Sequence, residues 1–402
     1  MAEQEYPAPD SVSRLQTRAF GVGAIALLLA LYGAVRSPQT FFASYLMSFL
    51  LVLGIALGSL GLVMLQHLTA GHWGVIIRRP LESATRTLPM LVIAFLPIAI
   101  FGMQYLYSGG NGNDKGWLNA PASGEGALSA FQKSWLTHSG YLIRAVIYFA
   151  VWLALMFIFN IWSKQQDANK ADRTLRQRFR MLAGPGIILY VFAMSFASID
   201  WVMSISPHWA STIYGFIFVG GQLISSMSFM IAVVVLLARA EPFSGILQPR
   251  HLHDLGKLLL AFVMLWAYFD FSQMLIIWSG NQPEEISFYR TRLYGEWGIV
   301  ALIVVIFHFF VPFFLLLSQD LKRRAQIISK IAIWLILMRL VDLFWMTRPE
   351  FTSSAMPSWL DLVVPIALGG LWLGFFAFNL KQCPLLPLGD PKLEEAIEQH
   401  HE

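Results

Sequence analysis

The sequence predicts an all-α polytopic membrane protein, and three observations support this prediction. Hydrophobic residues make up 56% of the 402 residues and charged residues only 13%, about half the charge of an ordinary soluble domain. The mean hydropathy is +0.59, and apolar stretches long enough to cross a bilayer recur along the chain. The single cysteine, Cys383, excludes disulfide frameworks, thiolate zinc sites, iron–sulfur clusters and covalently attached haem.

Ten apolar stretches are predicted to be transmembrane helices, because about 20 apolar residues rising about 1.5 Å each span about 30 Å of hydrocarbon. In chain order they cover residues 19–35, 41–65, 88–107, 140–162, 184–203, 211–238, 257–279, 296–318, 327–346 and 359–380. The first stretch follows Arg14 and Arg18 and has no small-residue cleavage site behind it, so we interpret it as a retained helix. The predicted organisation is an N-terminal segment of residues 1–18, a membrane domain of residues 19–380 and a C-terminal tail of residues 381–402.

Positive charge is distributed unevenly between the two sides of the predicted membrane domain. Nineteen of the 28 lysine and arginine residues lie in the terminal segments or in loops after even-numbered helices, whereas six lie in the opposite loops. By the positive-inside rule, both termini are predicted to be cytoplasmic. The net charge of +4 therefore indicates membrane topology, and we expect no nucleic-acid partner.

A short internal repeat suggests how the helices are grouped. The fifth predicted helix ends with Ile-Asp-Trp-Val-Met at residues 199–203, and the ninth ends with Val-Asp-Leu-Phe-Trp-Met at residues 341–346. Four helices separate the two copies, and both run outward from the cytoplasm. This spacing predicts two parallel four-helix bundles, helices 2–5 and 6–9, with the first and tenth helices as flanks.

Two ionisable residues are predicted near the middle of the membrane, where each costs at least about 2.5 kcal/mol and so needs a partner, water or a function. Asp270 lies about 20 Å into the seventh helix, and His308 lies at a similar depth in the eighth. An aspartate and a histidine at one level can pass a proton between them. The alternative is a static hydrogen bond that holds two helices together. The neighbours expected to support a proton path are Tyr268, Ser272 and Gln273.

Three further charged residues are predicted near the outer side. Arg339 and Asp342 are three positions apart on the ninth helix, so we expect them to form an ion pair. This pair is either structural or opens to water and exchanges protons. Asp200 has no basic neighbour on its own helix, so we expect its partner to be Tyr214 or His208 at the outer mouth.

The cytoplasmic mouth of a proton path is expected at His67, His72, His253 and Asp254. A metal site is not expected there, because no third soft ligand accompanies His251 and His253. Protohaem is disfavoured as well, because it needs deeply placed histidines on two helices and only His308 is deep.

Short segments spread from the second helix to the ninth form a distinctive set: residues 67–73, 78–82, 198–204, 207–209, 211–215, 253–257, 261–268, 271–273, 276–281, 283–286 and 339–345. Together they resemble the ActF-type membrane subunit of Alternative Complex III, the bacterial quinol:cytochrome c oxidoreductase of the respiratory chain. The resemblance covers most of the chain. It implies ten helices in two four-helix bundles, the fold of the NrfD and PsrC-like subunits that handle quinones.

The resemblance also implies a location and partners. The location is the bacterial inner membrane. The partners are a pentahaem cytochrome c, an iron–sulfur subunit, a second NrfD-like subunit called ActC and small anchor subunits. Haem c and iron–sulfur clusters then belong to partner subunits, quinol oxidation belongs mainly to ActC, and this chain binds no redox cofactor.

The predicted function is therefore proton conduction within this complex, with electrons passing through partner subunits. One alternative is a quinone- or quinol-binding role, with menaquinone or ubiquinone in an outward-facing aromatic pocket formed by Asp200, Trp201 and His208. A second is a secondary transporter, which would need helix breaks at matching positions of both halves, and the prolines provide no such pair. A third is a scaffold whose polar residues only hold helices together.

Overall fold

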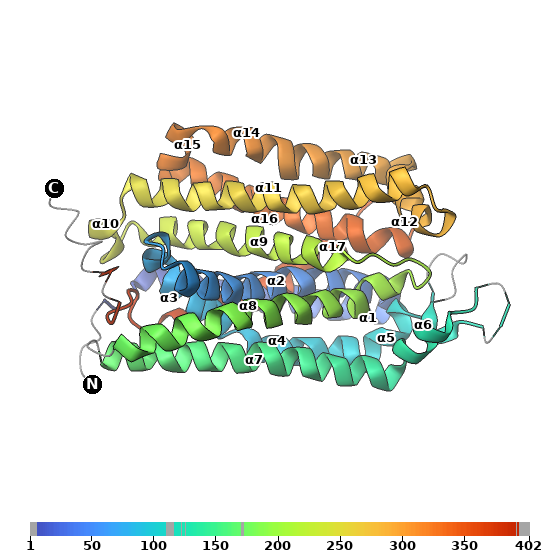
Figure 1. Ribbon diagram of the computed structural model, residues 1–402, viewed down its shortest axis with the longest axis horizontal. Helices are drawn as coiled ribbons and strands as arrows, with labels where there is room; N and C mark the ends of the chain where they lie inside the picture. The colour runs from blue at the N-terminus through green and yellow to red at the C-terminus, as the bar shows by residue number, and fades with distance from the viewer. Residues whose placement is uncertain are drawn as a thin grey trace.

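The computed structural model describes residues 6–109, 116–121, 123–124, 126–169, 173–390 and 392–393, and all regular secondary structure in these residues is helical. The long helices lie side by side along the long axis, and shorter helices and loops join them at both ends (Figure 1). This is the architecture of a helical polytopic membrane protein. Of the predicted terminal segments, residues 1–5, 391 and 394–402 lie outside the described residues.

The long continuous helices are α1 (Asp10–Arg36), α2 (Pro38–Thr69), α7 (His138–Ala168), α8 (Arg173–Trp201), α9 (Tyr214–Leu237), α11 (Pro249–Gly280), α16 (Ala325–Thr347) and α17 (Leu360–Leu380). Two more consist of successive segments: α3 (Trp73–Thr85), α4 (Leu88–Pro97), η1 (Ile98–Gly102) and α5 (Met103–Leu106), and then α13 (Gly295–Val304), η4 (Val305–Phe310) and α14 (Val311–Leu317). The short helices are η2 (Trp117–Asn119), α6 (Ala130–Trp135), η3 (Met203–Ile205), α10 (Phe243–Ile246), α12 (Pro283–Leu293), α15 (Gln319–Arg323) and η5 (Arg348–Glu350).

Nine helices in the described part of the chain are long and apolar enough to cross a membrane. They coincide with nine of the ten predicted stretches. The remaining stretch, residues 327–346, corresponds to α16, which is long but carries Lys330, Arg339 and Asp342. Many large apolar side chains on the outward faces of the nine are exposed, including Ile25 at 65% and Ile93 at 68%, as lipid contact requires.

Helices α2 and α9 form the centre of the molecule. The two helices pack on each other, α2 also contacts α3, α8 and α17, and α9 also contacts α8, α11 and α16. The approach of α2 to α9 depends on Gly58, because a Cβ there would lie 2.2 Å from the carbonyl oxygen of Gln222. Small residues permit such close backbone contact where lipid gives helices no hydrophobic drive to associate.

The two ends of the bundle are distinguished by the chain termini. The backbone N–H of Leu385 donates a hydrogen bond to the carbonyl oxygen of Tyr6 (3.1 Å), so the first and last described segments meet at one end. We call this the terminal end, and it also carries α10 and α15. The opposite end, which carries α5, α6 and α12, is called the distal end (Figure 1).

Candidate functional site

A buried charged cluster lies between α16, η4 and α11. Arg339 Nη1 donates to Asp342 Oδ2 as predicted, and both side chains are almost fully buried. His308 comes from η4, and its Nδ1 lies 4.0 Å from the same Asp342 oxygen, which is too far for a hydrogen bond. The indole ring of Trp266 on α11 lies over the imidazole, with centroids 4.3 Å apart. We call these four residues the central cluster.

The hydrogen-bonding capacity of the central cluster is largely unused. His308 is 0% exposed, and neither of its ring nitrogens has a hydrogen-bond partner among the described residues. The same holds for the indole nitrogen of Trp266. An unsatisfied buried polar group costs about 1–3 kcal/mol, and buried water is the usual remedy. This arrangement therefore favours a hydrated interior at the cluster.

The local chain geometry positions His308. Its segment, η4, is a π-helical stretch inside an otherwise α-helical span, and Pro312 follows four residues after His308. Proline has no N–H to donate to the carbonyl four residues earlier, so the α-helical pattern is interrupted here. Single π-helical turns within α-helices are frequent at functional sites.

Helix α9 provides space for the arginine of the cluster. The guanidinium of Arg339 lies against Gly221, where a Cβ would be only 2.1 Å from the guanidinium carbon. The preceding Gly220 faces Trp266 in the same way, with a Cβ distance of 3.3 Å. The two adjacent glycines on α9 thus allow Arg339 of α16 and Trp266 of α11 to pack closely against neighbouring positions of α9.

Asp270 lies beside the central cluster but makes no hydrogen bond within the described part of the chain. Its side chain is half-buried, and its carboxylate is in electrostatic range of both Asp342 and Arg339. Asp270 and His308 are therefore grouped around the same ion pair, although no contact joins them directly. One turn further along α11, Gln273 is buried and its Oε1 accepts a hydrogen bond from Ser211 (2.6 Å).

Two of the predicted supporting residues make no contact with the central cluster in the described part of the chain. Tyr268 is 64% exposed on the outer face of α11, so it is oriented toward lipid and away from the cluster. Ser272 is half-buried and makes no hydrogen bond with the described residues. Both residues lie on α11 near Asp270, but Tyr268 is on a different face of the helix from the cluster.

The predicted partners of Asp200 are wrong. Its carboxylate pairs with Arg144 on α7, which donates from Nε (2.8 Å) and Nη2 (2.9 Å). Two more donors complete the set, the Tyr148 hydroxyl (2.7 Å) and the Trp135 indole (2.8 Å), and Asp200 is 0% exposed. Neither Tyr214 nor His208 takes part. Sequence could have indicated Arg144, because it lies one turn into the neighbouring predicted helix at the depth of Asp200.

The other residues of the predicted aromatic pocket lie in different surroundings. Trp201 is 0% exposed and packs among aromatic rings, with Phe95 at a centroid distance of 4.8 Å. His208 is half-buried and has no hydrogen-bond partner among the described residues. A pocket of about 570 Å³ does open nearby, and Trp135 lines it, but Asp200, Trp201 and His208 do not.

An ionic network at the terminal end was not predicted as a unit. The guanidinium groups of Arg78 and Arg79 bind Glu82 within α3 (3.0 and 2.6 Å). Arg78 also pairs with Asp390 (3.0 Å), and Arg79 pairs with Asp167 on α7. The segment after α17 is thereby fixed to α3 and α7. The motif at residues 78–82 was visible in the sequence, but the partners 88 and 312 positions away were not.

The four residues expected at the cytoplasmic mouth fall into separate places at the terminal end. His67 is stacked on Phe179 of α8 with ring centroids 4.0 Å apart. His253 and Asp254 lie at the start of α11, where Asp254 pairs with Lys257 (3.2 Å). His72 is exposed in the link between α2 and α3. These contacts do not join them into one site.

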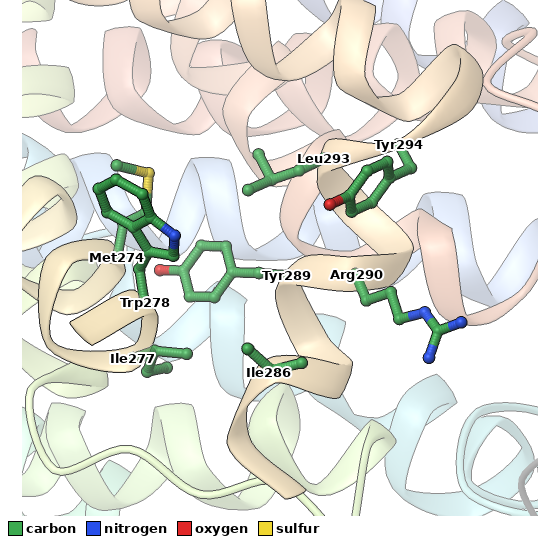
Figure 2. A pocket seen from close by; sticks show the side chains of 8 residues that line it. All are labelled: Met274, Ile277, Trp278, Ile286, Tyr289, Arg290, Leu293 and Tyr294. Carbon is green, nitrogen blue, oxygen red and sulfur yellow. The ribbon is translucent and has the colours of Figure 1, made fainter. Parts of the chain in front are cut away.

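A pocket lies toward the distal end between α11 and α12 (Figure 2). Its volume is about 900 Å³. It is lined by Met274, Ile277, Trp278, Ile286, Tyr289, Arg290, Leu293 and Tyr294. None of these residues was predicted as a site. Within the described ranges, no group of three or more His, Cys, Asp or Glu side chains is arranged to hold a metal ion.

No protein-family model matches the chain, and no curated protein matches it either.

Proposed function

We propose that the chain is a proton-conducting membrane subunit of a bacterial quinol:cytochrome c oxidoreductase of the Alternative Complex III type. The sequence resemblance to ActF-type subunits supports the identity of the complex. In this proposal α16 also crosses the membrane, as the ninth of ten transmembrane helices in chain order. Helices α2 to α8 and α9 to α16 form the two bundles, and α1 and α17 flank them. The terminal end faces the cytoplasm, where positive charge is concentrated.

The observation that carries this proposal is the central cluster. A buried ion pair without further polar groups would be a structural device. Here, a fully buried histidine with two unused nitrogens lies 4.0 Å from the carboxylate of that pair. Histidine is the side chain whose ordinary pKa allows it both to accept and to release a proton near neutral pH. Water between the imidazole and Asp342 would connect them.

The route we propose uses the residues grouped around the Arg339–Asp342 pair. Asp270 and His308 carry protons on either side of that pair, and Asp342 connects them. Arg339 holds one carboxylate oxygen and offsets its charge, so Asp342 can be ionised without an uncompensated charge in the membrane. Asp200 is left out of the route, because the four hydrogen bonds that its carboxylate accepts leave no acceptor position free for water.

In the complex, this chain supplies no redox centre. Haem c and iron–sulfur clusters belong to the pentahaem cytochrome and iron–sulfur partners, and quinol oxidation belongs to ActC. The chain therefore couples to electron transfer only through contacts with these subunits. A change in the central cluster should alter proton movement while electron transfer continues.

The experiment measures protons moved per electron by the complex reconstituted in vesicles, with Asp270→Asn and His308→Gln compared with the parent. We expect the ratio to fall in both variants while quinol oxidation and haem content are kept. The matched control is Asp320→Asn, an exposed aspartate on α15. An unchanged ratio in both test variants would overturn the proposal.

A second candidate function, quinone binding, is favoured by the pocket of about 570 Å³ beside Asp200. Aromatic and apolar side chains line it, including Phe131, Trp135 and Met203, with Gln132 and Glu285 as polar groups. This composition suits a quinone head group. Saturable binding of a quinone analogue that is lost in Phe131→Ala and kept in Phe314→Ala, an exposed residue elsewhere, would support this role.

A further inference from the structure

The large pocket between α11 and α12 begins one helical turn from Asp270. Its α11 lining residues are Met274, Ile277 and Trp278, which are four, seven and eight positions after Asp270. This spacing places all four residues on one stripe of the helix. Four residues of helix rise about 6 Å, so the nearest wall of the pocket lies about that far from Asp270 along the axis.

The opposite wall of the pocket carries a buried phenol that is in electrostatic range of Asp270. Tyr289 of α12 is 8% exposed, and Figure 2 shows its hydroxyl directed across the pocket toward Met274 and Trp278 of α11. Burial raises the pKa of the Tyr289 phenol above its ordinary value, and the nearby Asp270 carboxylate raises it further, whereas Arg292 lowers it. The phenol is therefore neutral, and its O–H remains available as a donor.

Several polar groups around the pocket have no protein partner. Among the described residues, neither the hydroxyl of Tyr289 nor that of Tyr294 makes a hydrogen bond, and the indole nitrogen of Trp278 makes none. In Figure 2 the Tyr294 hydroxyl also points into this space, whereas the Arg290 guanidinium is turned away from it. A buried water needs a space large enough to hold it and two to four polar partners, and this pocket offers both.

We propose that this pocket is a water-filled vestibule through which Asp270 exchanges protons with the distal side. Tyr289 is a positioning residue in it. Its hydroxyl orients the water that takes the proton from the Asp270 carboxyl group, and the proton leaves through the pocket. The inference rests on the proposed proton-conducting function. It adds that Asp270 exchanges protons with the distal side and that Tyr289 controls this exchange.

Cysteine labelling tests the vestibule independently of proton movement. Met274→Cys lines the pocket, and the matched control Leu275→Cys is the adjacent residue, 41% exposed on another face of α11. The parent complex controls for the buried native Cys383. A charged, membrane-impermeant thiol reagent is added from one side at a time. We expect Met274→Cys to react from the distal side at least about tenfold faster than Leu275→Cys, because a thiol facing hydrocarbon is not ionised.

The second measurement is proton movement per electron after labelling. We expect labelled Met274→Cys to lose proton movement to the level of Asp270→Asn, and Tyr289→Phe to lower it while quinol oxidation continues. Equal labelling of both cysteines, as expected for a pocket filled by lipid, would contradict the proposal that the pocket is a water-filled vestibule. Labelling of Met274→Cys that leaves proton movement unchanged would contradict it as well. The proposed function would still stand in either case if Asp270→Asn or His308→Gln lowers the ratio. If neither variant lowers it, the proposed function falls and the proton exchange at Asp270 falls with it, even where Met274→Cys labels selectively.

Discussion

Asp200 and Asp342 occupy matching positions in the short internal repeat, and each is buried beside an arginine, but their surroundings differ. The Asp200 carboxylate receives four hydrogen bonds from three side chains. The Asp342 carboxylate receives one, from Arg339, within the described part of the chain. At Asp200, protein side chains supply all the hydrogen-bond donors that the carboxylate needs. The second site leaves hydrogen-bonding capacity on Asp342 and His308 unused, and the proposed function assigns that capacity to water.

The comparison shows that a buried acid in a membrane protein is not by itself evidence for proton transport. The evidence for such a role is whether protein groups fill all the hydrogen-bonding positions of the acid or leave some of them for water. A filled network is rigid and costly to break, and such networks hold helices together. An unfilled one needs solvent, and solvent is what carries protons.

Arg144→Ala should have the largest effect on stability. It leaves the fully buried Asp200 carboxylate without its cation, which costs about 3–5 kcal/mol in the free energy of unfolding. Denaturant titration of the detergent-solubilised protein measures this. The control Arg239→Ala removes an exposed arginine and should change stability by less than about 0.5 kcal/mol. If Arg144→Ala changed the free energy of unfolding as little as Arg239→Ala, the hydrogen-bonded ion pair at Asp200 would not have the structural role that we assign to it.

Gly221→Ala should come next. The added methyl would lie 2.1 Å from the guanidinium carbon of Arg339, so the arginine must move, at a cost of about 1–3 kcal/mol. The same titration measures it, together with protons moved per electron, which should fall. Gly369→Ala is the matched control, because no atom lies within 4 Å of its added Cβ. Normal stability and proton movement in Gly221→Ala would contradict the close packing of the Arg339 guanidinium against Gly221.

If water satisfies the imidazole, as the proposed function requires, His308→Phe should change the free energy of unfolding by less than about 1 kcal/mol. At the filled site, Tyr148→Phe removes a donor to a buried carboxylate and should cost about 1.5–3 kcal/mol. The difference between the two variants, measured by one denaturation protocol, sharpens the comparison. A marked stabilisation by His308→Phe would indicate that the nitrogens are dry and unsatisfied in the parent.

Tyr268→Phe should have the smallest effect. The side chain is 64% exposed on the outer face of α11, so loss of its hydroxyl should leave both stability and protons per electron within error of the parent. Proton movement by the reconstituted complex is the measurement. A clear fall would place Tyr268 in the path after all, as its sequence position near Asp270 suggested.

Sequence predicted the helices well because apolar length is a local property. Nine of the ten predicted stretches match apolar helices, and the remaining one, residues 327–346, corresponds to α16. The Arg339–Asp342 pair was predicted correctly for the same reason, since both residues are on one helix. The helical stripe that joins Asp270 to Met274 was also present in the sequence, but the pocket beside it depends on how α12 folds back.

Contacts between helices were harder to predict. Arg144 lies 56 positions from Asp200, and Asp390 lies 312 positions from Arg78. Nothing local to either residue identifies its partner. The π-helical segment around His308 was not predicted either, although Pro312 is a local signal for a break in the hydrogen-bond pattern. Depth matching of charged residues on neighbouring helices would have found the Asp200 partner.

The most direct test of the account is a density map of the purified complex at a resolution that shows ordered water. The account predicts water within hydrogen-bond distance of the His308 nitrogens and between His308 and Asp342, and a dry, directly bonded carboxylate at Asp200. A map with no water at His308, and apolar side chains packed against both ring nitrogens, would contradict it.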